Sequence, residues 1–301
     1  MHIGVIGLGR MGRIVAERLV DAGHEVTGYD IDEPTREAVA TETEINVEGT
    51  IEELCEGLPE PLRMWVMVPA GDAVDEALTA VEPHLDEDAV VVDGGNSHFA
   101  MSIGRSRALR CGYLDCGTSG GVAGREIGLS LMIGGPEWAV EEMVPALQAV
   151  AGGPEGWEHL GPAGAGHYVK MVHNGIEYAL MQAYGEGFEL LHAGRYDLDL
   201  AQVANVWTEN AVIRSWLLEL CADAFETEGN DLGDVDDHIA GGSTGRWTVE
   251  EAIAQEVPVP LIYTALAERY ASRNPRFSHQ LANRLRHGFG GHPVVRTEDD
   301  R

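Results

Sequence analysis

The first twelve residues hold the feature that most constrains the fold, a glycine pattern that follows an apolar run. His2-Ile3-Gly4-Val5-Ile6 predicts a short buried strand, and Gly7-Leu8-Gly9-Arg10-Met11-Gly12 comes directly after it. The next residues repeat apolar side chains at helical spacing. Strand, Gly-x-Gly-x-x-Gly and helix in this order form the dinucleotide-binding fingerprint in the context that it requires. Gly7 would permit the tight turn, Gly9 the approach of a pyrophosphate, and Gly12 close packing of the helix on the strand.

A carboxylate at the end of the second predicted strand indicates which dinucleotide binds. Residues 25–30 end in Asp30, eighteen residues after Gly12. A carboxylate at this place accepts hydrogen bonds from the adenosine ribose and repels a 2′-phosphate. Asp30 therefore favours NAD over NADP. Arg36 leaves room for NADP, and a simple turn aspartate at a strand end is the alternative without a binding role.

Further apolar runs at residues 63–68 and 89–93 predict parallel strands that open into loops of small residues. Ligands bind at the carboxyl ends of strands in open α/β sheets. A third run ends in a Ser-Gly-Gly loop whose backbone N–H groups could hold a carboxylate. The same residues would also be found in a flexible turn without a binding role. The expected cofactor-binding residues are Gly7, Leu8, Gly9, Arg10, Met11, Gly12, Asp30, Val68, Pro69, Ala70 and Asn96. Residues 129–136 predict another strand and residues 137–150 a helix.

The only lysine of the chain lies in a long predicted helix that begins after a glycine-rich stretch and runs to about His192. Helical spacing places Lys170, His173, Asn174 and Glu177 on one face. We expect the opposite face to pack on a core; its residues are Val169, Val172, Ile176, Ala179, Leu180 and Ala183. The alternative without a functional role is a solvent-exposed stripe of lysine and glutamate. It is disfavoured because nineteen of the twenty basic residues are arginine, which cannot supply a neutral amine as a base.

Composition and charge bound the class of protein. The formal net charge is −30, which disfavours nucleic acid or anionic membrane as the main partner. Such acidity with so little lysine indicates a protein adapted to high salt. No run of eighteen apolar residues is present, no leader is expected, and the four cysteines lack metal-site spacing, so we expect a cytoplasmic enzyme with free thiols and no metal.

The domain organisation follows from these elements. We predict an α/β Rossmann-type domain at residues 1–162 and an all-α domain for substrate binding and oligomerisation at residues 163–301. Beyond the lysine helix, helical spacing is found at residues 200–210, 214–227 and 261–273.

Six motifs accumulate in one order along the chain: Gly-Leu-Gly-Arg-Met-Gly, Asp-Gly-Gly-Asn-Ser, Ser-Gly-Gly, Lys-Met-Val-His-Asn-Gly-Ile-Glu-Tyr, Gly-Arg-Trp-Thr and a tail rich in arginine and histidine. Together they resemble 6-phosphogluconate dehydrogenase (decarboxylating) in its short, often NAD-linked form, within the β-hydroxyacid dehydrogenases. The lysine motif is the most specific of them, because many dehydrogenases share the glycine pattern.

The resemblance implies a mechanism and a set of contacts. Lys170 would take the proton of the substrate's C3 hydroxyl, and Glu177 would protonate C1 after loss of CO₂. Substrate-binding roles are implied for Asn96, Ser119, Gly120, Gly121, His173, Asn174, Tyr178, Thr244, Arg269, Arg286 and His292. The expected product is ribulose 5-phosphate. In the family the tail reaches into a neighbouring subunit, which implies a homodimer or homotetramer.

One departure and two alternatives accompany this hypothesis. A phosphate-binding lysine of the family falls on Gly242, where Arg246 or Ser243 would have to compensate. The first alternative is a β-hydroxyacid dehydrogenase for an unphosphorylated acid such as 3-hydroxyisobutyrate or gluconate. It gives no reason for a second anion site made of Arg269, Arg286 and His292. The second alternative is an NAD-sensing module without catalysis.

Overall fold

The computed structural model describes residues 1–273, 277 and 280–281, and its internal contacts divide the chain into two compact units, Met1–Asn174 and Gly175–Arg301. The first unit contains a sheet in the order β3-β2-β1-β4-β5-β6-β7-β8. Its strands are β1 (His2–Ile6), β2 (Glu25–Tyr29), β3 (Asn46–Val47), β4 (Arg63–Val66), β5 (Val90–Asp93), β6 (Gly112–Ser119), β7 (Ser130–Gly134) and β8 (Trp157–Gly161). Neighbouring strands are parallel except β6 and β7, which pair antiparallel.

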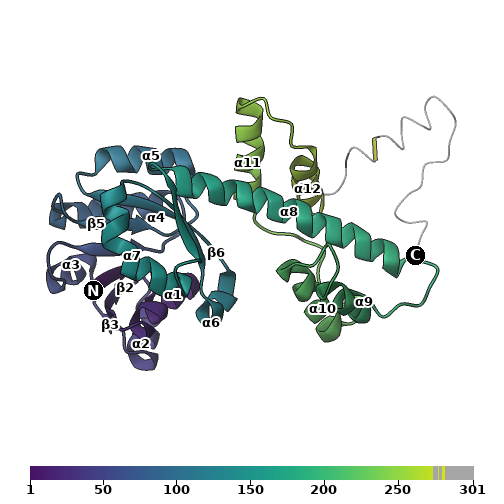
Figure 1. The fold of residues 1–301 in the computed structure, drawn as a ribbon, viewed down its shortest axis with the longest axis horizontal. Helices are drawn as coiled ribbons and strands as arrows, with labels where there is room; N and C mark the ends of the chain where they lie inside the picture. The colour runs from purple at the N-terminus through teal and green to yellow at the C-terminus, as the bar shows by residue number, and fades with distance from the viewer. Residues whose placement is uncertain (274–276, 278–279, 282–301) are drawn as a thin grey trace. The chain divides into compact units, whose positions relative to one another are not determined.

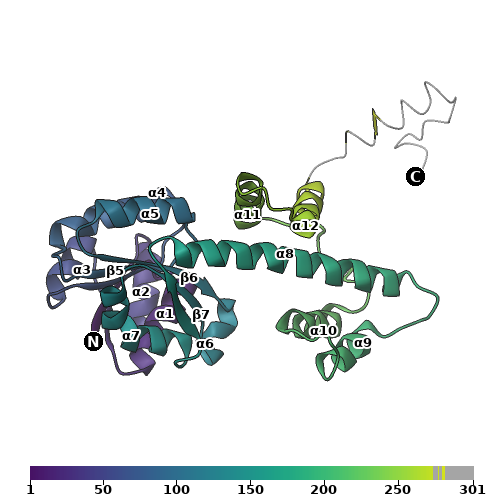
Figure 2. The same cartoon turned by 45° about the horizontal axis from the view of Figure 1, so that its top comes forward.

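Helices cover both faces of this sheet, as Figures 1 and 2 show. They are α1 (Arg10–Asp21), α2 (Glu33–Glu42), α3 (Ile51–Gly57), α4 (Asp72–Val81), α5 (Phe99–Ala108), α6 (Gly124–Ile127) and α7 (Glu137–Ala151), with short 3₁₀ turns η1 (Glu82–His84) and η2 (Gly121–Ala123). Successive valines of β5 point to opposite faces: Val90 and Val92 join the core under α1 and α7, and Val91 joins the core under α3 and α4. The Rossmann-type fold is therefore confirmed.

Side-chain caps explain where several helices begin. The Asp32 carboxylate accepts from the Thr35 N–H at the start of α2, and the Thr50 hydroxyl accepts from the Glu53 N–H at the start of α3. Asp199 and Ser215 act in the same way in the second unit. Each cap satisfies an N–H group that the first turn of a helix leaves without a partner.

The second unit is helical, and α8 (Ala165–His192) runs from the first unit into it, so the predicted length of this helix is confirmed. The other helices are α9 (Leu200–Thr208), α10 (Trp216–Glu228), α11 (Ser243–Ala254) and α12 (Pro260–Ala271). In Figures 1 and 2, α9 and α10 lie on one side of the distal part of α8, and α11 and α12 lie on the other. In the described part of the chain, no helix is long and apolar enough to cross a membrane.

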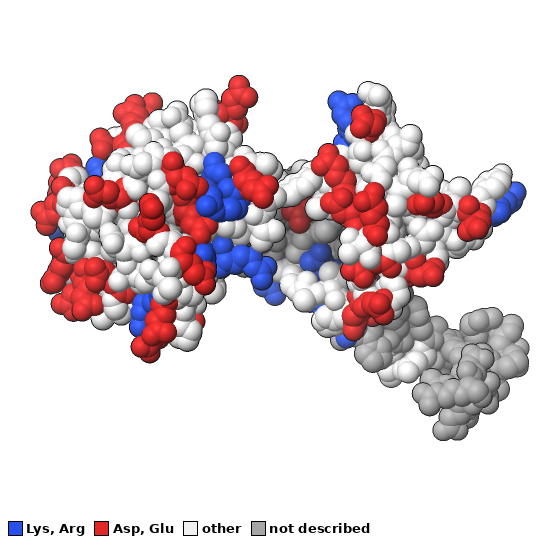
Figure 3. Space-filling model, turned by 90° about the horizontal axis from the view of Figure 1, so that it is seen from below, with Lys and Arg blue, Asp and Glu red and all other residues white. Residues whose placement is uncertain are grey.

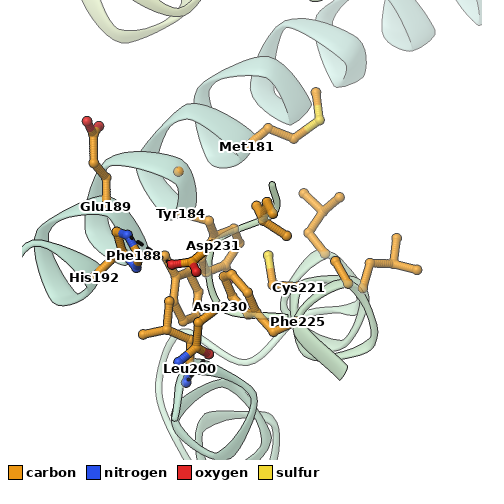
Figure 4. A pocket seen from close by; sticks show the side chains of 15 residues that line it. Met181, Tyr184, Phe188, Glu189, His192, Leu200, Cys221, Phe225, Asn230 and Asp231 are labelled. Carbon is orange, nitrogen blue, oxygen red and sulfur yellow. Dashed lines mark hydrogen bonds and ion pairs between the residues drawn. The ribbon is translucent and has the colours of Figure 1, made fainter. Parts of the chain in front are cut away.

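Two small cores hold the helical unit together. Phe188 of α8 packs on Phe225 of α10 with ring centroids 5.0 Å apart, and Tyr178 packs with Val249 and Leu266. Beside the first core lies a mostly apolar cavity of about 530 Å³ (Figure 4). Its wall includes Tyr184 and Phe188, with His192 and Asp231 paired at 3.6 Å. These cores are small beside those of the sheet.

One expectation from the sequence needs correction. The prediction for the apolar side of α8 was wrong, because Val169, Ile176 and Leu180 are 38%, 51% and 43% exposed whereas Lys170 is only 5% exposed. The helix approaches the sheet at Gly166 and through the lysine stem, which packs on Gly117 of β6, instead. Strand β8 and helix α11 were also not predicted, and both begin beside glycines that weaken the pattern in the sequence.

Candidate active site

The glycine loop between β1 and α1 is shaped for close backbone approach. Gly7 has φ +91°, and a Cβ there would lie 2.6 Å from the Met67 carbonyl oxygen. A Cβ on Gly12 would lie 1.8 Å from the Gly7 carbonyl oxygen, so only glycine lets α1 pack this closely. Gly9 has nothing within 4 Å of its Cβ position and directly precedes the first turn of α1. The loop thus exposes a helix N-terminus that suits a phosphate.

Asp30 lies at the carboxyl end of β2 and holds this loop. One carboxylate oxygen accepts from the Leu8 N–H at 2.7 Å, and the other accepts from the Asp32 N–H at 2.9 Å. A carboxylate has further lone pairs, so Asp30 can still accept from ribose hydroxyls. The Arg36 guanidinium donates to the carbonyl oxygens of Asp30 and Ile31 at 2.7 and 3.2 Å. The remaining expected cofactor residues, Val68, Pro69 and Ala70, follow β4, and the Val68 side chain lies beside Gly7.

The start of α8 is held directly on the sheet. The buried Asp115 carboxylate of β6 accepts from the N–H groups of Gly164 and His167 at 2.6 and 2.8 Å. A Cβ on Gly166 would lie 2.2 Å from the Met132 carbonyl oxygen, and one on Gly117 would lie 2.4 Å from the Cβ of Lys170. The helix N-terminus therefore bonds to a carboxylate as a capped helix does, and glycines bring the lysine stem onto β6.

Three of the predicted site residues, Lys170, Asn174 and Ser119, converge around the imidazole of a fourth, His173. The Lys170 Nζ lies 3.4 Å from His173 Nδ1, and Asn174 Oδ1 lies 3.0 Å from the same nitrogen. On the other side of the ring, Nε2 lies 3.4 Å from the Ser119 hydroxyl. Nδ1 can donate to the amide oxygen of Asn174 or accept from the amine, but it cannot do both at once. A buried amine, an imidazole, an amide and a hydroxyl meet here, which suits proton transfer from a bound hydroxyl group.

Two loops border this cluster. Ser119 is followed by Gly120 and Gly121, whose φ angles of +117° and +54° favour glycine. Asn96 is exposed at the tip of the loop after β5, between residues that the buried Asp93 binds. The Tyr113 hydroxyl also donates to Asp93 at 2.8 Å, and burial together with that carboxylate raises the pKa of the tyrosine. The structure therefore fixes the base of the Asn96 loop while its tip stays accessible.

The remaining described candidates lie in the helical unit. The Arg269 guanidinium lies 3.9 Å from the ring centre of Tyr178, and a Cβ on Gly245 would lie 2.4 Å from that ring. Thr244 is in the first turn of α11, and Glu177 is half-buried in α8, seven residues after Lys170. Arg286 and His292 lie outside the described residues.

Gly242, the position without the expected lysine, has φ +119°, a backbone conformation that favours glycine. Its Cβ position lies 3.5 Å from Arg273 and 3.7 Å from Arg269. Arg246, which was expected to compensate, is half-exposed beside Glu250 at 3.4 Å. Sequence reasoning missed Arg273. Its spacing of four residues from Arg269 on one helical stretch could have indicated a shared face.

Comparison with known proteins identifies the family. Residues 2–161 match the family model described as the NAD binding domain of 6-phosphogluconate dehydrogenase, and residues 166–299 match its C-terminal domain. The chain belongs to the 6-phosphogluconate dehydrogenase family. The NAD(+)-dependent, decarboxylating 6-phosphogluconate dehydrogenase of Haloferax volcanii is 63% identical over 99% of this chain and 100% of that protein.

Other relatives of this family differ in length. A putative 6-phosphogluconate dehydrogenase of Bacillus subtilis is 39% identical over 97% of this chain and 98% of its own. The decarboxylating enzyme of Salmonella typhimurium is 36% identical, and the match covers 90% of this chain but 61% of that one. The solved Plasmodium falciparum 6-phosphogluconate dehydrogenase superposes with a TM-score of 0.83 at 29% identity, covering 100% of this chain and 67% of that chain.

A 3-hydroxyisobutyrate dehydrogenase of Mycobacterium tuberculosis shares the fold, with a TM-score of 0.71 at 22% identity, covering 90% of this chain and 92% of that one. The first family model ends at residue 161 and the second begins at residue 166, whereas the compact units meet at residues 174 and 175. The difference arises because the first turns of α8 pack on the sheet.

Proposed function

We propose that this chain catalyses the oxidative decarboxylation of 6-phosphogluconate to ribulose 5-phosphate and CO₂, with hydride transfer to NAD. The observation that carries the proposal is the convergence of Lys170, His173, Asn174 and Ser119 in the unit that also carries a dinucleotide-type loop. The Haloferax volcanii relative, matched along its full length, is named for this reaction and this cofactor.

The residues of the first unit fit a bound NAD. Gly9 leaves room for the pyrophosphate at the N-terminus of α1, Gly7 and Gly12 allow the tight turn and the close packing of α1, and Asp30 would accept from the adenosine ribose and repel a 2′-phosphate. Val68, Pro69, Ala70 and Asn96 would complete the cofactor contacts. The bound nicotinamide supplies an acceptor for the hydride that leaves C3 of the substrate.

The side chains of α8 would carry the proton transfers. Lys170, as a neutral amine, takes the proton of the C3 hydroxyl while C3 is oxidised to a ketone. The ketone lies β to the carboxylate and accepts the electron pair that loss of CO₂ releases. Lys170 returns the proton to the ketone oxygen, which gives the enediol. Glu177 then donates a proton to C1 while Lys170 takes the hydroxyl proton back. His173, Asn174 and Asn96 orient the substrate, and Ser119, Gly120 and Gly121 hold its carboxylate end.

The helical unit would bind the phosphate end of the substrate. Arg269 and Arg273 flank Gly242, and they would supply positive charge where the family's lysine is missing. Thr244 of α11, and Tyr178 of α8, whose ring lies 3.9 Å from the Arg269 guanidinium, would add hydroxyl donors. Because guanidinium groups pair well with phosphate oxygens, this arrangement favours a phosphorylated sugar acid over gluconate. We also assign substrate contacts to Arg286 and His292.

We further propose that the enzyme is a homodimer or homotetramer in which the C-terminal tail reaches a neighbouring site. The large exposed apolar side chains of the helical unit support association, among them Ile176 at 51%, Leu190 at 76% and Leu261 at 76% exposed. Sedimentation at micromolar concentration in molar KCl would show the oligomer. A monomer that is fully active would contradict it.

The surface fits a cytoplasm of high salt. Acidic side chains are spread over the face of each unit seen in Figure 3, with arginines among them. We propose that salt screens this repulsion and that the enzyme works in the cytoplasm, where its four free cysteines stay reduced.

The decisive assay follows NADH, NADPH and CO₂ in molar KCl with 6-phosphogluconate, gluconate and 3-hydroxyisobutyrate. We expect NADH and CO₂ in equal amounts from 6-phosphogluconate and little turnover of the other acids or of NADP. NADH without CO₂ from an unphosphorylated acid would favour the β-hydroxyacid dehydrogenase alternative. NAD binding without any turnover would favour the sensing module.

A further inference from the structure

His167 is a buried polar residue of α8 to which the proposed chemistry gives no task. It is 1% exposed and lies one helical turn before Lys170. Its Nε2 lies 3.0 Å from the Gly95 carbonyl oxygen, and its Nδ1 lies 2.7 Å from the hydroxyl of Ser102, which is fully buried. A carbonyl oxygen only accepts, so Nε2 carries a ring proton. In the neutral ring Nδ1 then accepts from the serine hydroxyl, and the two partners select the Nε2–H tautomer.

The Gly95 carbonyl belongs to the peptide unit that joins Gly95 to Asn96. Other contacts of this loop come from the sheet and from α5, where the Arg105 guanidinium donates to the Ser97 hydroxyl at 2.9 Å. The Thr118 hydroxyl donates to the Gly94 carbonyl at 3.1 Å, and Asp93 accepts from the Gly95 N–H at 3.3 Å and from the Ser97 hydroxyl at 2.9 Å. Among these contacts, the bond from His167 is the one that comes from α8, the helix that carries Lys170.

We propose that His167 is a positioning residue that fixes the Asn96 loop to α8, so that Asn96 and Lys170 keep a set separation. The inference rests on the proposed function, in which both side chains contact the substrate. Without the Nε2 bond, the peptide before Asn96 loses its link to the helix while Asp93 and Thr118 still hold the loop's base. The expected result is a misplaced substrate-orienting group in a folded enzyme. Displacements of about 1 Å near reacting atoms cost up to roughly a hundredfold in rate.

Two variants of similar polarity separate this role from simple core packing. Glutamine at position 167 reaches as far as Nε2 and can donate to the Gly95 carbonyl. Asparagine reaches only as far as Nδ1 and can bond to Ser102 but not to Gly95. We expect His167→Gln to keep kcat within a few-fold of the wild type. His167→Asn should lower kcat by about 10- to 100-fold with the KM for NAD unchanged, because the cofactor loop is not touched.

Hydrogen exchange of residues 94–98 is the readout that needs no substrate. We expect faster exchange in His167→Asn than in His167→Gln, with α1 and β1 unchanged. Equal exchange and equal kcat in the two variants would overturn the inference, whatever acid the wild type oxidises. Should neither variant fold, the wild type still decides: exchange of residues 94–98 must be as slow as that of the first turns of α8. Free exchange there would refute the link. A wild type that fails to oxidise 6-phosphogluconate overturns the proposed function alone.

Discussion

The two units differ in how completely they bury their apolar side chains. In the first unit both faces of the sheet are covered, and Ile3, Trp65 and Val91 are fully buried. In the helical unit Val206 is 66% exposed and Leu261 is 76% exposed, and the cores beside α8 are small. The first unit can therefore hold its geometry from its own packing, whereas the second leaves apolar surface for further burial.

The same contrast divides the proposed site. Of the groups proposed for chemistry, Lys170, Asn174 and Ser119 contact the His173 ring within the first unit, on a helix start that Asp115 and two glycines fix. Glu177, the proposed acid, belongs to the helical unit. The groups proposed for the phosphate, Thr244, Arg269 and Arg273, belong to the helical unit. Substitutions in the first set should lower kcat, and those in the second should raise the KM for the phosphorylated substrate.

Replacing Lys170 with Met should give the largest effect. The thioether keeps the stem that packs on Gly117 but cannot take a proton, so we expect kcat to fall by about a hundred- to ten-thousandfold. NAD binding, measured by fluorescence titration, should stay unchanged because the glycine loop is untouched. Turnover at the wild-type rate would refute the assignment of the base and, with it, the division of labour between the units.

Phe188→Ala tests whether the helical unit has a core of its own. The side chain is 6% exposed and packs on Phe225 and Trp207, so its loss should lower the free energy of unfolding of that unit by about 3–5 kcal/mol. The Kd for NAD should not change. Leu147→Ala, in the fully buried core of the first unit, is the matched control and should weaken NAD binding. Denaturant unfolding monitored together with NAD binding would distinguish the two results. If both variants weakened NAD binding equally, the two units would not have independent cores.

Gly12→Ala and Gly9→Ala test the glycine loop inside the first unit. A Cβ at position 12 meets the Gly7 carbonyl at 1.8 Å, so we expect a loss of about 1–3 kcal/mol in stability as well as weaker NAD binding. At position 9 the same Cβ meets nothing within 4 Å, so stability should be kept and only NAD binding should weaken. Equal melting temperatures for the two variants would contradict this account of the loop.

Thiol alkylation tests the burial of the cysteines in the first unit and is expected to have the smallest effect on the enzyme. Burial raises the pKa of Cys111 to about 11 and that of fully buried Cys116 to about 12. Because the thiolate is the reactive form, the rate at Cys111 should rise about tenfold for each pH unit between pH 8 and 10. Cys116 should stay unmodified in the native protein, as mass spectrometry of the labelled chain would show. Fast labelling of Cys116 at pH 8 would mean that the core of the first unit opens.

Local patterns in the sequence predicted the parts of the fold that depend on local geometry. The glycine loop, the apolar strands near residues 63–68 and 89–93, and the full length of α8 follow from spacing within one segment. Strand β8 has alternate half-buried and exposed residues with few apolar ones, and its pairing with β7 defines it. Helix α11 begins in a glycine-rich stretch and depends on the contacts of Gly245 with Tyr178 and of Thr248 with Gly175.

The candidate site shows the same limit. The spacing of Lys170, His173 and Asn174 revealed the cluster, because neighbouring turns of one helix bring them together. Asp115, His167 and Arg273 were missed, since their roles come from contacts with residues far away in the sequence. The apolar side of α8 was assigned to a core that the described single chain does not provide.

The most direct test of the central claim compares two substrates in the wild type and in Arg269→Gln. The account predicts that the variant raises the KM for 6-phosphogluconate about ten- to hundredfold, as expected for the loss of one charged hydrogen bond, and leaves kcat within about threefold. Gluconate, which has no phosphate, should be used equally poorly by both proteins, and Arg269→Lys should recover part of the affinity. A collapse of kcat with both substrates, or an unchanged KM for 6-phosphogluconate, would contradict it.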